Sequence, residues 1–408
     1  MNNTAPEANT SALAPFSVRS FRFQWPADLL TSWAFEMETL ILGWYVLVET
    51  DSVLLLTAFG SLQFLGTLIA PMVGVAADRL GRRVVLCAMR ASYGALALAI
   101  MVLALSDKLN AYWVLAIALL AGLVRPSDLV VRNSLIGDTV PGSWLARAIG
   151  LSRTTMDSAR IAGALAGAGL FATLGIGPAY MGVVALYALS FALTFGVAGR
   201  STGYASDAAS PWQELKAGLR YIRHTPQVLA LMLLAFLVNL TAYPISMGLL
   251  PYVAKEIYAL DQNGLGHLVA GYACGALLGS VIMILAGGAR RPGRLMVIGT
   301  LVWYLTLVVF ALQETKWPGF VVLLTIGVVQ SMAMIAMSVT LLQITPEKFR
   351  GRIMGVRMLA VYGLPLGLLA AGGLVGWIGF APTVWAYAVF GIVCTAYIAW
   401  RWRTVIWR

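Results

Sequence analysis

The stretch GVAADRLGRR, residues 74–83, decides the fold of this chain because it sets a charged turn between two long apolar runs. The runs cover residues 53–77 and 84–105, and each is long enough to cross a bilayer as a helix. An arginine at the centre of a bilayer costs about 2.5–3.5 kcal/mol on insertion scales. The three arginines of the stretch therefore predict that the chain turns here at a membrane surface.

The composition of the whole chain indicates the same class. Of its 408 residues, 60% are hydrophobic and 11% are charged, whereas a soluble domain carries about 25% charged residues. The net charge of +11 comes from small basic clusters at the ends of apolar runs, so we expect a lipid bilayer and no nucleic acid as a partner. Cys87, Cys274 and Cys394 lie in separate runs. With no nucleotide-binding or catalytic motif either, we expect no metal, no cofactor and no enzymatic activity.

The apolar runs predict an all-α polytopic membrane protein with twelve transmembrane helices in two six-helix halves. The expected spans are residues 23–48, 52–77, 84–105, 111–136, 144–173, 178–199, 227–257, 264–288, 294–312, 319–342, 352–376 and 380–400. Most arginines and lysines fall on one side of these spans. By the positive-inside rule both termini are then cytoplasmic, in a multi-pass protein of the cell inner membrane.

Four regions follow from this topology. We expect a cytoplasmic N-terminal tail over residues 1–22 without a removed signal peptide, a first half over 23–199, a cytoplasmic linker over 200–226 and a second half over 227–408. The linker is either plain or an interfacial helix on the inner leaflet, with Trp212, Leu215, Leu219 and Ile222 on one face and Lys216, Arg220 and Arg223 on the other. A Pro…Arg-x-x-Gly pattern at 141–150 recurs at 346–355, which indicates an internal repeat.

Three carboxylates lie inside the first expected span. Glu36 is near its middle, Glu38 is about 200° further around the helix, and Asp28 is about 80° from Glu36. A buried carboxylate is hard to keep charged, so such a group can exchange protons, balance a cationic substrate or be neutralised by a neighbouring helix. The residues expected to serve in proton coupling or substrate charge are Glu36, Glu38, Asp28, Arg125 and Asp128.

Charged residues in spans four and five have three alternative pairings. Arg125 with Asp128 and Asp157 with Arg160 stand three residues apart, so each pair can be neutralised on its own helix, and this is the default expectation. The four groups can also pair across the two helices, or Arg125 can change partner when Glu36 or Asp128 is protonated. The acidic residues of the second half lie at span ends. Any proton site is therefore expected in the first half.

The second half has polar and polarisable side chains inside its spans. Span seven contains a proline at position 244, and a broken helix is tolerated only where protein or a cavity satisfies the freed backbone. Span ten is rich in methionine, which suits ligands of varied shape, although methionines and aromatics in a span usually serve packing. The expected substrate cavity consists of Trp33, Phe35, Asn239, Tyr243, Gln330 and Met334.

The stretch 74–83, placed after the second of twelve spans, resembles the loop signature of the major facilitator superfamily. The passage Asn133…Val140-Pro141…Leu145-Ala146 is similar to the branch that contains enterobactin exporters and macrolide efflux proteins. The resemblance implies the major facilitator fold and a lock between the halves, closed on the cytoplasmic side when the carrier faces outward. The implied gating residues are Gly74, Asp78, Arg79, Gly81, Arg82 and Arg83. In the alternative interpretation the arginines only anchor the topology.

The resemblance also implies that spans two and eleven meet across the halves, as do spans five and eight. Small residues recur every four positions on these spans, which lets helix backbones approach closely. The stripes are Gly66, Ala70 and Gly74; Ala159, Gly163 and Gly167; Gly271, Gly275 and Gly279; and Gly363, Gly367 and Ala371. We expect them at an interface where the halves rock against each other, with ordinary helix packing as the alternative.

The predicted function is that of a secondary-active carrier working by alternating access. We expect a monomer that exports a small amphipathic compound, drug-like or siderophore-like, in exchange for protons. Its partners would be that small-molecule substrate, protons and the lipid bilayer. A lipid or lysophospholipid flippase of the same fold is the alternative within transport, and a non-transporting membrane receptor or scaffold is the alternative of another class.

Overall fold

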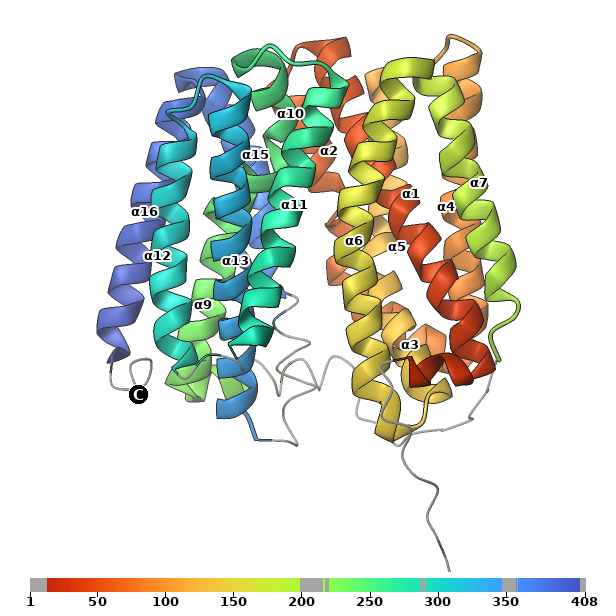
Figure 1. Cartoon of the computed structure of the whole chain (residues 1–408), viewed down its shortest axis with the longest axis horizontal. Coiled ribbons are helices and arrows are strands. Elements are labelled where there is room, and N and C mark those ends of the chain that lie inside the picture. The colour runs from red at the N-terminus through yellow and green to blue at the C-terminus, as the bar shows by residue number, and fades with distance from the viewer. Residues whose placement is uncertain are drawn as a thin grey trace, which may run out of the picture.

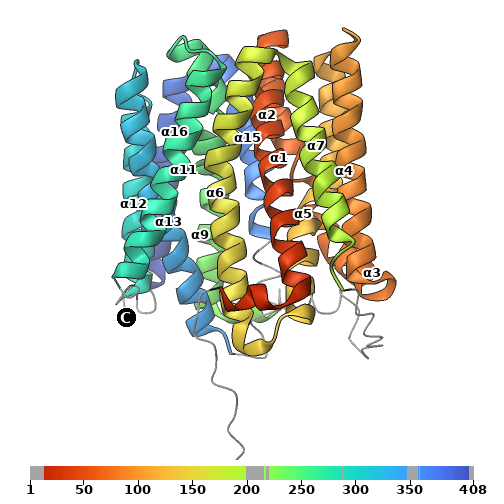
Figure 2. The same cartoon turned by 45° about the vertical axis from the view of Figure 1, so that its right-hand side comes forward.

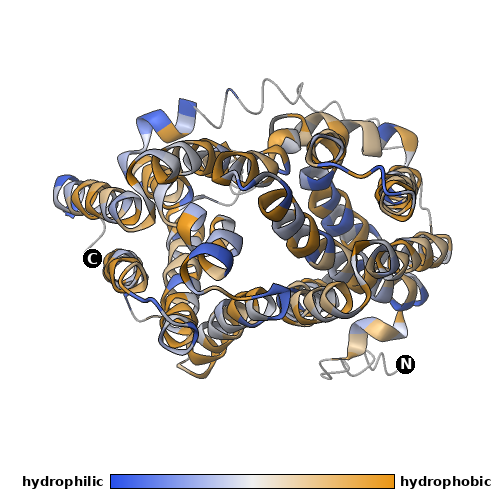
Figure 3. Cartoon of the chain, turned by 90° about the horizontal axis from the view of Figure 1, so that it is seen from above, coloured by the Kyte–Doolittle hydropathy of each residue, from blue (hydrophilic) through white to orange (hydrophobic). Residues whose placement is uncertain are grey.

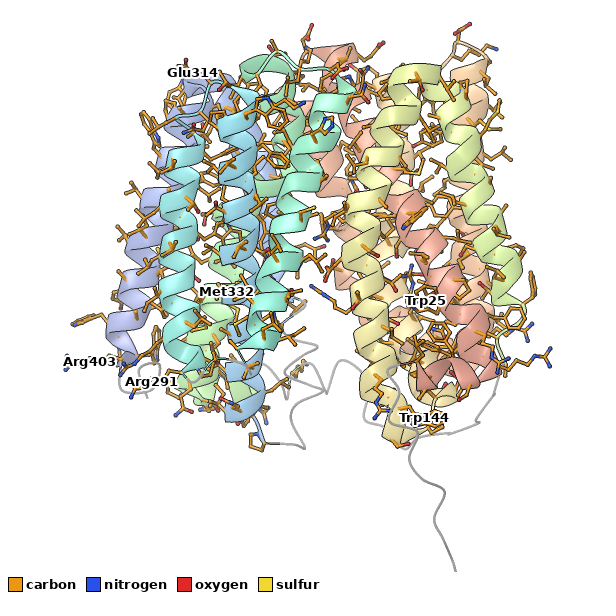
Figure 4. The ribbon with its side chains drawn as sticks, viewed as in Figure 1. Trp25, Trp144, Arg291, Glu314, Met332 and Arg403 are labelled. Atoms are coloured by element: carbon orange, nitrogen blue, oxygen red, sulfur yellow. The ribbon has the colours of Figure 1, made fainter. Side chains whose placement is uncertain are left out.

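A computed structural model describes residues 13–198, 216, 220–286, 289, 291–346, 357 and 359–403, without the side chains of residues 68, 71, 74, 75, 78 and 146. The regular structure of these residues is helical throughout. The helices stand side by side in two groups, with the first half at the right and the second half at the left of Figure 1. Arg291 and Arg403 lie at one end of the bundle, the basic side, and Glu314 lies at the opposite end, the far side (Figure 4).

The helices form twelve rods, six in each half, if consecutive pieces of an interrupted rod are taken together. The first half contains α1 (Arg19–Thr50), α2 (Val53–Leu62) with η2 (Leu65–Leu68) and α3 (Ala70–Leu80), α4 (Arg82–Leu105), α5 (Ala111–Thr139), α6 (Gly142–Leu174) and α7 (Ile176–Thr194). The second half contains α9 (Pro226–Thr241) with η3 (Pro244–Gly248), α10 (Leu250–Tyr252) and η4 (Val253–Ile257), then α11 (Gln262–Leu285), α12 (Pro292–Phe310), α13 (Lys316–Ile344), α15 (Gly363–Ile378) and α16 (Phe380–Arg401). The predicted all-α fold is confirmed.

Eight helical segments of the described chain are long and apolar enough to cross a membrane by themselves. Two of the other rods, α1 and α6, carry charged side chains along their length. Seen along the helix axes, hydrophilic segments lie within the group of helices that carries the N-terminal end (Figure 3). Asp28 and Glu38 of α1 are buried among neighbouring helices, as a bilayer requires of charged groups, whereas Arg153 of α6 is exposed.

Two rods are interrupted, each for a local reason. The second rod breaks between α2 and α3, where Gly66 meets the carbonyl oxygens of Gly122 and Leu123 on α5 so closely that a Cβ would overlap them. The seventh rod contains a π-helical turn that begins at Pro244, because proline has no N–H to donate. The amide of Leu249 closes this turn on the carbonyl of Pro244 at 3.1 Å. The interruption expected at Pro244 is confirmed.

The two halves meet on the far side. There α2 packs against α15 and α6 packs against α11, which confirms the expected meeting of spans two and eleven and of spans five and eight. One apolar cluster draws buried residues from both halves, including Leu40, Trp44 and Ala168 of the first and Leu249 and Leu265 of the second. Another cluster, which packs around Phe21, Ile136 and Val140 near the basic side, draws on the first half alone.

The arrangement of the helices agrees with these contacts between the halves. The helices α6 and α11 approach each other at the far side and separate toward the basic side (Figure 1). In the view turned by 45°, α6 and α11 are again neighbours at the boundary between the two groups of helices (Figure 2). The structure is therefore closed on the far side, and its halves diverge toward the basic side.

The expected role of the glycine stripes is wrong, because the glycines pack within each half. Gly163 and Gly167 face α1, and Gly66 faces α5. In the second half, Gly271, Gly275 and Gly279 face α13, and Gly363 and Gly367 face α9. Close contacts between the halves use other glycines, namely Gly266 against Ala168 and Gly372 against Thr57. A spacing of four predicts a small face, but it does not say which neighbour covers that face.

Two expectations fall mainly outside the described residues. They concern the linker over 200–226 and the second copy of the repeat at 346–355. Within the described part of the linker, Ile222 is buried in an apolar cluster, whereas Arg220 and Arg223 are exposed.

Candidate functional site

The charged turn between α3 and α4 forms hydrogen bonds with residues of the first half. Gly81 makes the turn with φ at 95°, a conformation that favours glycine. Arg82 donates to Asp138 Oδ1 on α5 at 2.5 Å, and Arg83 donates to the carbonyl of Phe195, just after α7, at 2.7 Å. Arg79 is exposed, whereas the surroundings of Gly74 and of the Asp78 side chain lie outside the described part. In this conformation Arg82 and Arg83 therefore connect helices of one half.

Asp28 belongs to a compact cluster of charges on the basic side of the first half. It forms an ion pair with Arg90 of α4, which is fully buried, and lies 3.4 Å from Arg132 Nε of α5. Arg132 in turn lies 2.5 Å from Asp128 Oδ2 on its own helix. Two arginines and two carboxylates thus balance one another, which offsets the cost of removing them from water.

Glu38 lies in a second buried cluster, closer to the far side. It forms an ion pair with Arg125 of α5 and accepts hydrogen bonds from Tyr180 at 3.4 Å and Tyr187 at 3.0 Å, both on α7. Arg125 also donates to Gln63 Oε1 at 3.1 Å. The Phe35 ring lies 4.1 Å from the guanidinium carbon of Arg125, so Phe35, an expected cavity residue, covers an arginine of its own half.

The pairing expected within spans four and five is wrong. Arg125 and Arg160 pair with Glu38 and Glu36 of α1. Asp128 pairs with Arg132, and Asp157 lies 3.6 Å from Arg153, each one turn along the same helix. Pairing across α5 and α6 is absent from the described residues as well. The reason is that α1 packs against both helices and offers them carboxylates in the middle of the bundle.

Glu36 of α1 pairs with α6, the helix that packs against α11 of the second half. Its Oε1 is 3.5 Å from Nε of Arg160 on α6, and the two side chains keep 17% and 28% of their surface exposed. Gly163 makes this approach of α1 and α6 possible, because a Cβ there would lie 2.9 Å from the Cβ of Glu36. Arg160 also lies within electrostatic range of Tyr243 and Tyr272 in the second half.

Tyr243 and Gln330 form the facing part of the second half. The side-chain amide of Gln330 donates to Tyr243 OH at 2.7 Å, and the Tyr243 ring stands edge-on to Trp303. Arg153, Arg160 and Arg357 all act electrostatically on Tyr243. The structure thus pairs Glu36 with Arg160 in the first half and Tyr243 with Gln330 in the second, and Arg160 interacts electrostatically with Tyr243.

The other expected cavity residues, Asn239, Met334 and Trp33, take no part in the hydrogen bond between Tyr243 and Gln330. Asn239 donates to the carbonyl of Ala235 on its own helix at 2.8 Å. Met334 packs, partly buried, against two apolar clusters. Trp33 is partly buried on α1, and its buried Nε1 has no hydrogen-bond partner in the described structure. These three residues are not connected to the Tyr243–Gln330 pair by a hydrogen bond in the described part of the chain.

Two polar residues of this region were not predicted. Arg357 donates to Ser338 Oγ at 2.8 Å and lies within electrostatic range of Arg153 and Tyr243. The sequence feature that could have identified Arg357 is the presence of an arginine within the expected span 352–376. Gln63 joins Thr39 to Arg125, and its signal is a lone amide inside the second expected span.

A family model of the Major Facilitator Superfamily matches residues 29–365 of this chain. The chain belongs to the Major Facilitator Superfamily. It is therefore a multi-pass membrane transporter of that superfamily, and the predicted resemblance is confirmed.

The transporter is also similar to individual members of the superfamily. It is 27% identical over 165 residues to the enterobactin exporter EntS of Escherichia coli O139:H28, an alignment that covers 40% of this chain and 39% of the relative. EntS of Shigella boydii serotype 18 matches with the same identity and coverage. The match thus spans about two fifths of the length of these curated relatives.

Solved structures share the fold of this transporter. The nucleoside transporter NupG superposes with a TM-score of 0.74 at 15% identity, covering 93% of this chain and 98% of that one. A bacterial homologue of the human lysosomal transporter Spinster, in an inward-facing and unoccupied conformation, superposes with a TM-score of 0.72 at 14% identity, covering 98% of each chain.

Proposed function

We propose that this transporter is a secondary-active carrier that exports a small amphipathic compound in exchange for protons. Two packed halves that touch on one side and diverge on the other support alternating access, because rocking would open the far side as the basic side closes. The partial similarity to enterobactin exporters supports export and a siderophore-like or drug-like substrate.

The proposal places the basic side in the cytoplasm and the protein in the inner membrane. The turn between α3 and α4, which carries the charged stretch, lies at the same end of the bundle as Arg291 and Arg403 (Figures 1 and 4). An excess of arginine and lysine in short loops favours the cytoplasmic side. Both termini are then cytoplasmic. In this orientation the conformation described above faces inward.

The single observation that carries the proton coupling is the ion pair between Glu36 and Arg160 at the level where the halves face each other. Protonation of Glu36 would leave the charge of Arg160 without its carboxylate beside Tyr243 and Tyr272. An uncompensated charge in a site of low dielectric constant is costly, so the proton changes the relative free energies of the two arrangements of the halves. A proton bound on one side and released on the other would then drive the cycle.

The remaining predicted residues receive supporting roles in this proposal. Glu38 and Arg125 hold α1 to α5 and α7, and Asp28 and Asp128 hold α1 to α4 and α5 through Arg90 and Arg132. The residues of the stretch 74–83, Asp78 among them, would lock the halves when the basic side closes. Tyr243 and Gln330 would contact the substrate from the second half.

The proposed function is tested by flux measurements on the full chain in proteoliposomes. The panel would contain organic cations, siderophores and lysolipids, with and without an imposed proton gradient. We expect the gradient to accelerate flux of one of the first two classes. We also expect Glu36→Gln to abolish this acceleration while substrate exchange without a gradient continues.

Glu314→Gln is the matched control, because Glu314 is an exposed carboxylate on the far side. Flux that ignores both the gradient and Glu36→Gln would refute the coupling. Movement of lysolipids alone would favour the flippase, and substrate binding without any movement would favour a receptor.

A further inference from the structure

A cavity of about 200 Å3 lies in the first half between α1, α5 and α6, toward the basic side. The proposed function leaves this cavity without a role. Its apolar lining consists of Leu129 and Ile136 on α5 and Ile149 and Met156 on α6. A volume of this size accommodates a fragment such as a substituted benzene ring, and apolar walls favour such a fragment over water alone.

The polar lining of the cavity contains several hydrogen-bond donors. Arg132, Asn133, Ser152 and Arg153 all border it. The hydroxyl oxygen of Ser152 is buried and has no hydrogen-bond partner in the described residues. A buried hydroxyl without a partner is costly, so a ligand or water that bonds to it is favoured.

Arg153 has the most freely available charge at the cavity. Its side chain is 73% exposed, and its Nε lies 3.6 Å from Asp157, beyond ordinary hydrogen-bonding distance. The guanidinium therefore keeps donors for another acceptor. An arginine fork of this kind binds carboxylate or phosphate oxygens in pairs.

The charges around the cavity favour an anion over a cation. Asp28 is the one acidic residue among those that line it, and its carboxylate is already bound to Arg90 and Arg132. Arg132 also pairs with Asp128, so this cluster is balanced. Asp157, the carboxylate nearest to Arg153, does not line the cavity, so a cation there would meet the charge of Arg153, whereas an anion would meet Arg153 and the Ser152 hydroxyl.

We infer that this cavity is a subsite for the anionic group of an amphipathic substrate, a carboxylate or a phosphate monoester. The anion bonds to Arg153 and Ser152, and the adjoining apolar part of the substrate packs on Leu129, Ile149 and Met156. The inference rests on the proposed function, because it names the charge of the compound that the carrier moves. The substrate enters from the basic side, where Arg153 is exposed.

Binding of four matched probes to the full chain in nanodiscs tests the inference. Benzoate and phenyl phosphate represent the two anion types, benzamide is the neutral analogue and benzylammonium is the cation. We expect at least one anion to bind about tenfold more tightly than benzamide, because a charge-assisted hydrogen bond is stronger than a neutral one. Benzylammonium is expected to bind more weakly than benzamide.

Site-directed variants locate this binding. Arg153→Gln is expected to reduce the anion preference to about onefold, and Arg291→Gln, on the same side of the bundle, to leave it unchanged. In a chain whose three native cysteines are serines, benzoate is expected to slow the labelling of Ser152→Cys by a water-soluble thiol reagent about tenfold when it saturates the site.

Equal binding of anion and benzamide would overturn the inference, as would equal effects of Arg153→Gln and Arg291→Gln. The binding and labelling measurements are both made without a gradient. An anion site without proton-driven flux therefore refutes the proposed function alone, and proton-driven flux without an anion preference refutes the subsite alone.

Discussion

Lys255 of the second half forms an ion pair with Asp51 of the first half, on the side where the two halves meet. Asp51 ends α1 in a left-handed conformation, with φ at 47°, and Lys255 lies on the second π-helical turn of the seventh rod. This bond joins the halves only while the far side is closed. It therefore contributes to the balance between the two conformations rather than to the stability of either half.

Replacing Lys255 with methionine is expected to shift this balance toward opening of the far side. Exposed ion pairs contribute about 0.2–1 kcal/mol, so the shift should not exceed about fivefold. Distances between spin labels on the two halves measure it. Glu256→Gln is the control, because Glu256 also pairs with Lys255, at 2.8 Å, but belongs to the same half. Equal shifts in the two variants would contradict the prediction.

Glu38→Gln is expected to destabilise the first half strongly. The variant removes the carboxylate from beside Arg125, Tyr180 and Tyr187, and an unpaired buried arginine costs about 3–5 kcal/mol. Thermal unfolding in detergent should show a large fall in Tm, whereas Glu314→Gln should leave Tm near its original value. A Tm that stays unchanged in Glu38→Gln would show that the cluster does not hold α1 in place.

Gly163→Ala is expected to separate α1 from α6. The added methyl group would lie 2.9 Å from the Cβ of Glu36 and 3.1 Å from the carbonyl oxygen of Trp33, and overpacking of this kind costs about 1–3 kcal/mol. Gly169→Ala is the matched control on the same helix, since nothing lies within 4 Å of its Cβ position. Unfolding curves of the two variants should therefore differ, and identical curves would mean that α1 moves aside without cost.

Export of an anion is expected to respond to the membrane potential. One elementary charge crossing 100 mV changes the free energy by about 2.3 kcal/mol, and an inside-negative potential favours the outward movement of an anion. Potassium diffusion potentials of both signs, set with valinomycin at constant pH, measure this effect. Benzamide is the comparison: its exchange for one proton moves one charge fewer per cycle than exchange of a singly charged anion, so its efflux should respond less steeply to the potential. Faster anion efflux at an inside-positive potential would contradict the prediction.

Hydropathy and loop charges predict much of the fold, because each expected span is a local property of the chain. The expected twelve helical rods in two halves are present, and the superfamily resemblance correctly paired spans two and eleven. The partners of the charged residues were not predictable in the same way. Arg125 pairs with Glu38, which is 87 positions away in the sequence, and not with Asp128 in the next turn of its own helix. The packing of α1 against α5 decides this, because it places the Glu38 carboxylate beside the Arg125 guanidinium.

The candidate site was predicted in part for the same reason. Glu36, Tyr243 and Gln330 were expected; the structure pairs Glu36 with Arg160 and Tyr243 with Gln330, and their roles stay predictions. Phe35 was expected in the cavity but lies over Arg125. Arg160 and Arg153 were identified only as members of local pairs, and the contacts of Arg357 depend on Ser338, from another rod.

The interruption of the second rod has a consequence for the charged turn at its end. The piece above the break, α2, packs on the opposite half through α15, whereas the piece below it, α3, packs on α5 and α4 of its own half. In a continuous helix, any movement of the part packed on α15 would also move the part packed on α5 and α4. Because the rod is interrupted at residues 63–69, α2 can tilt with the opposite half while Arg82 stays bound to Asp138, until closure of the basic side brings the charged turn to the other half.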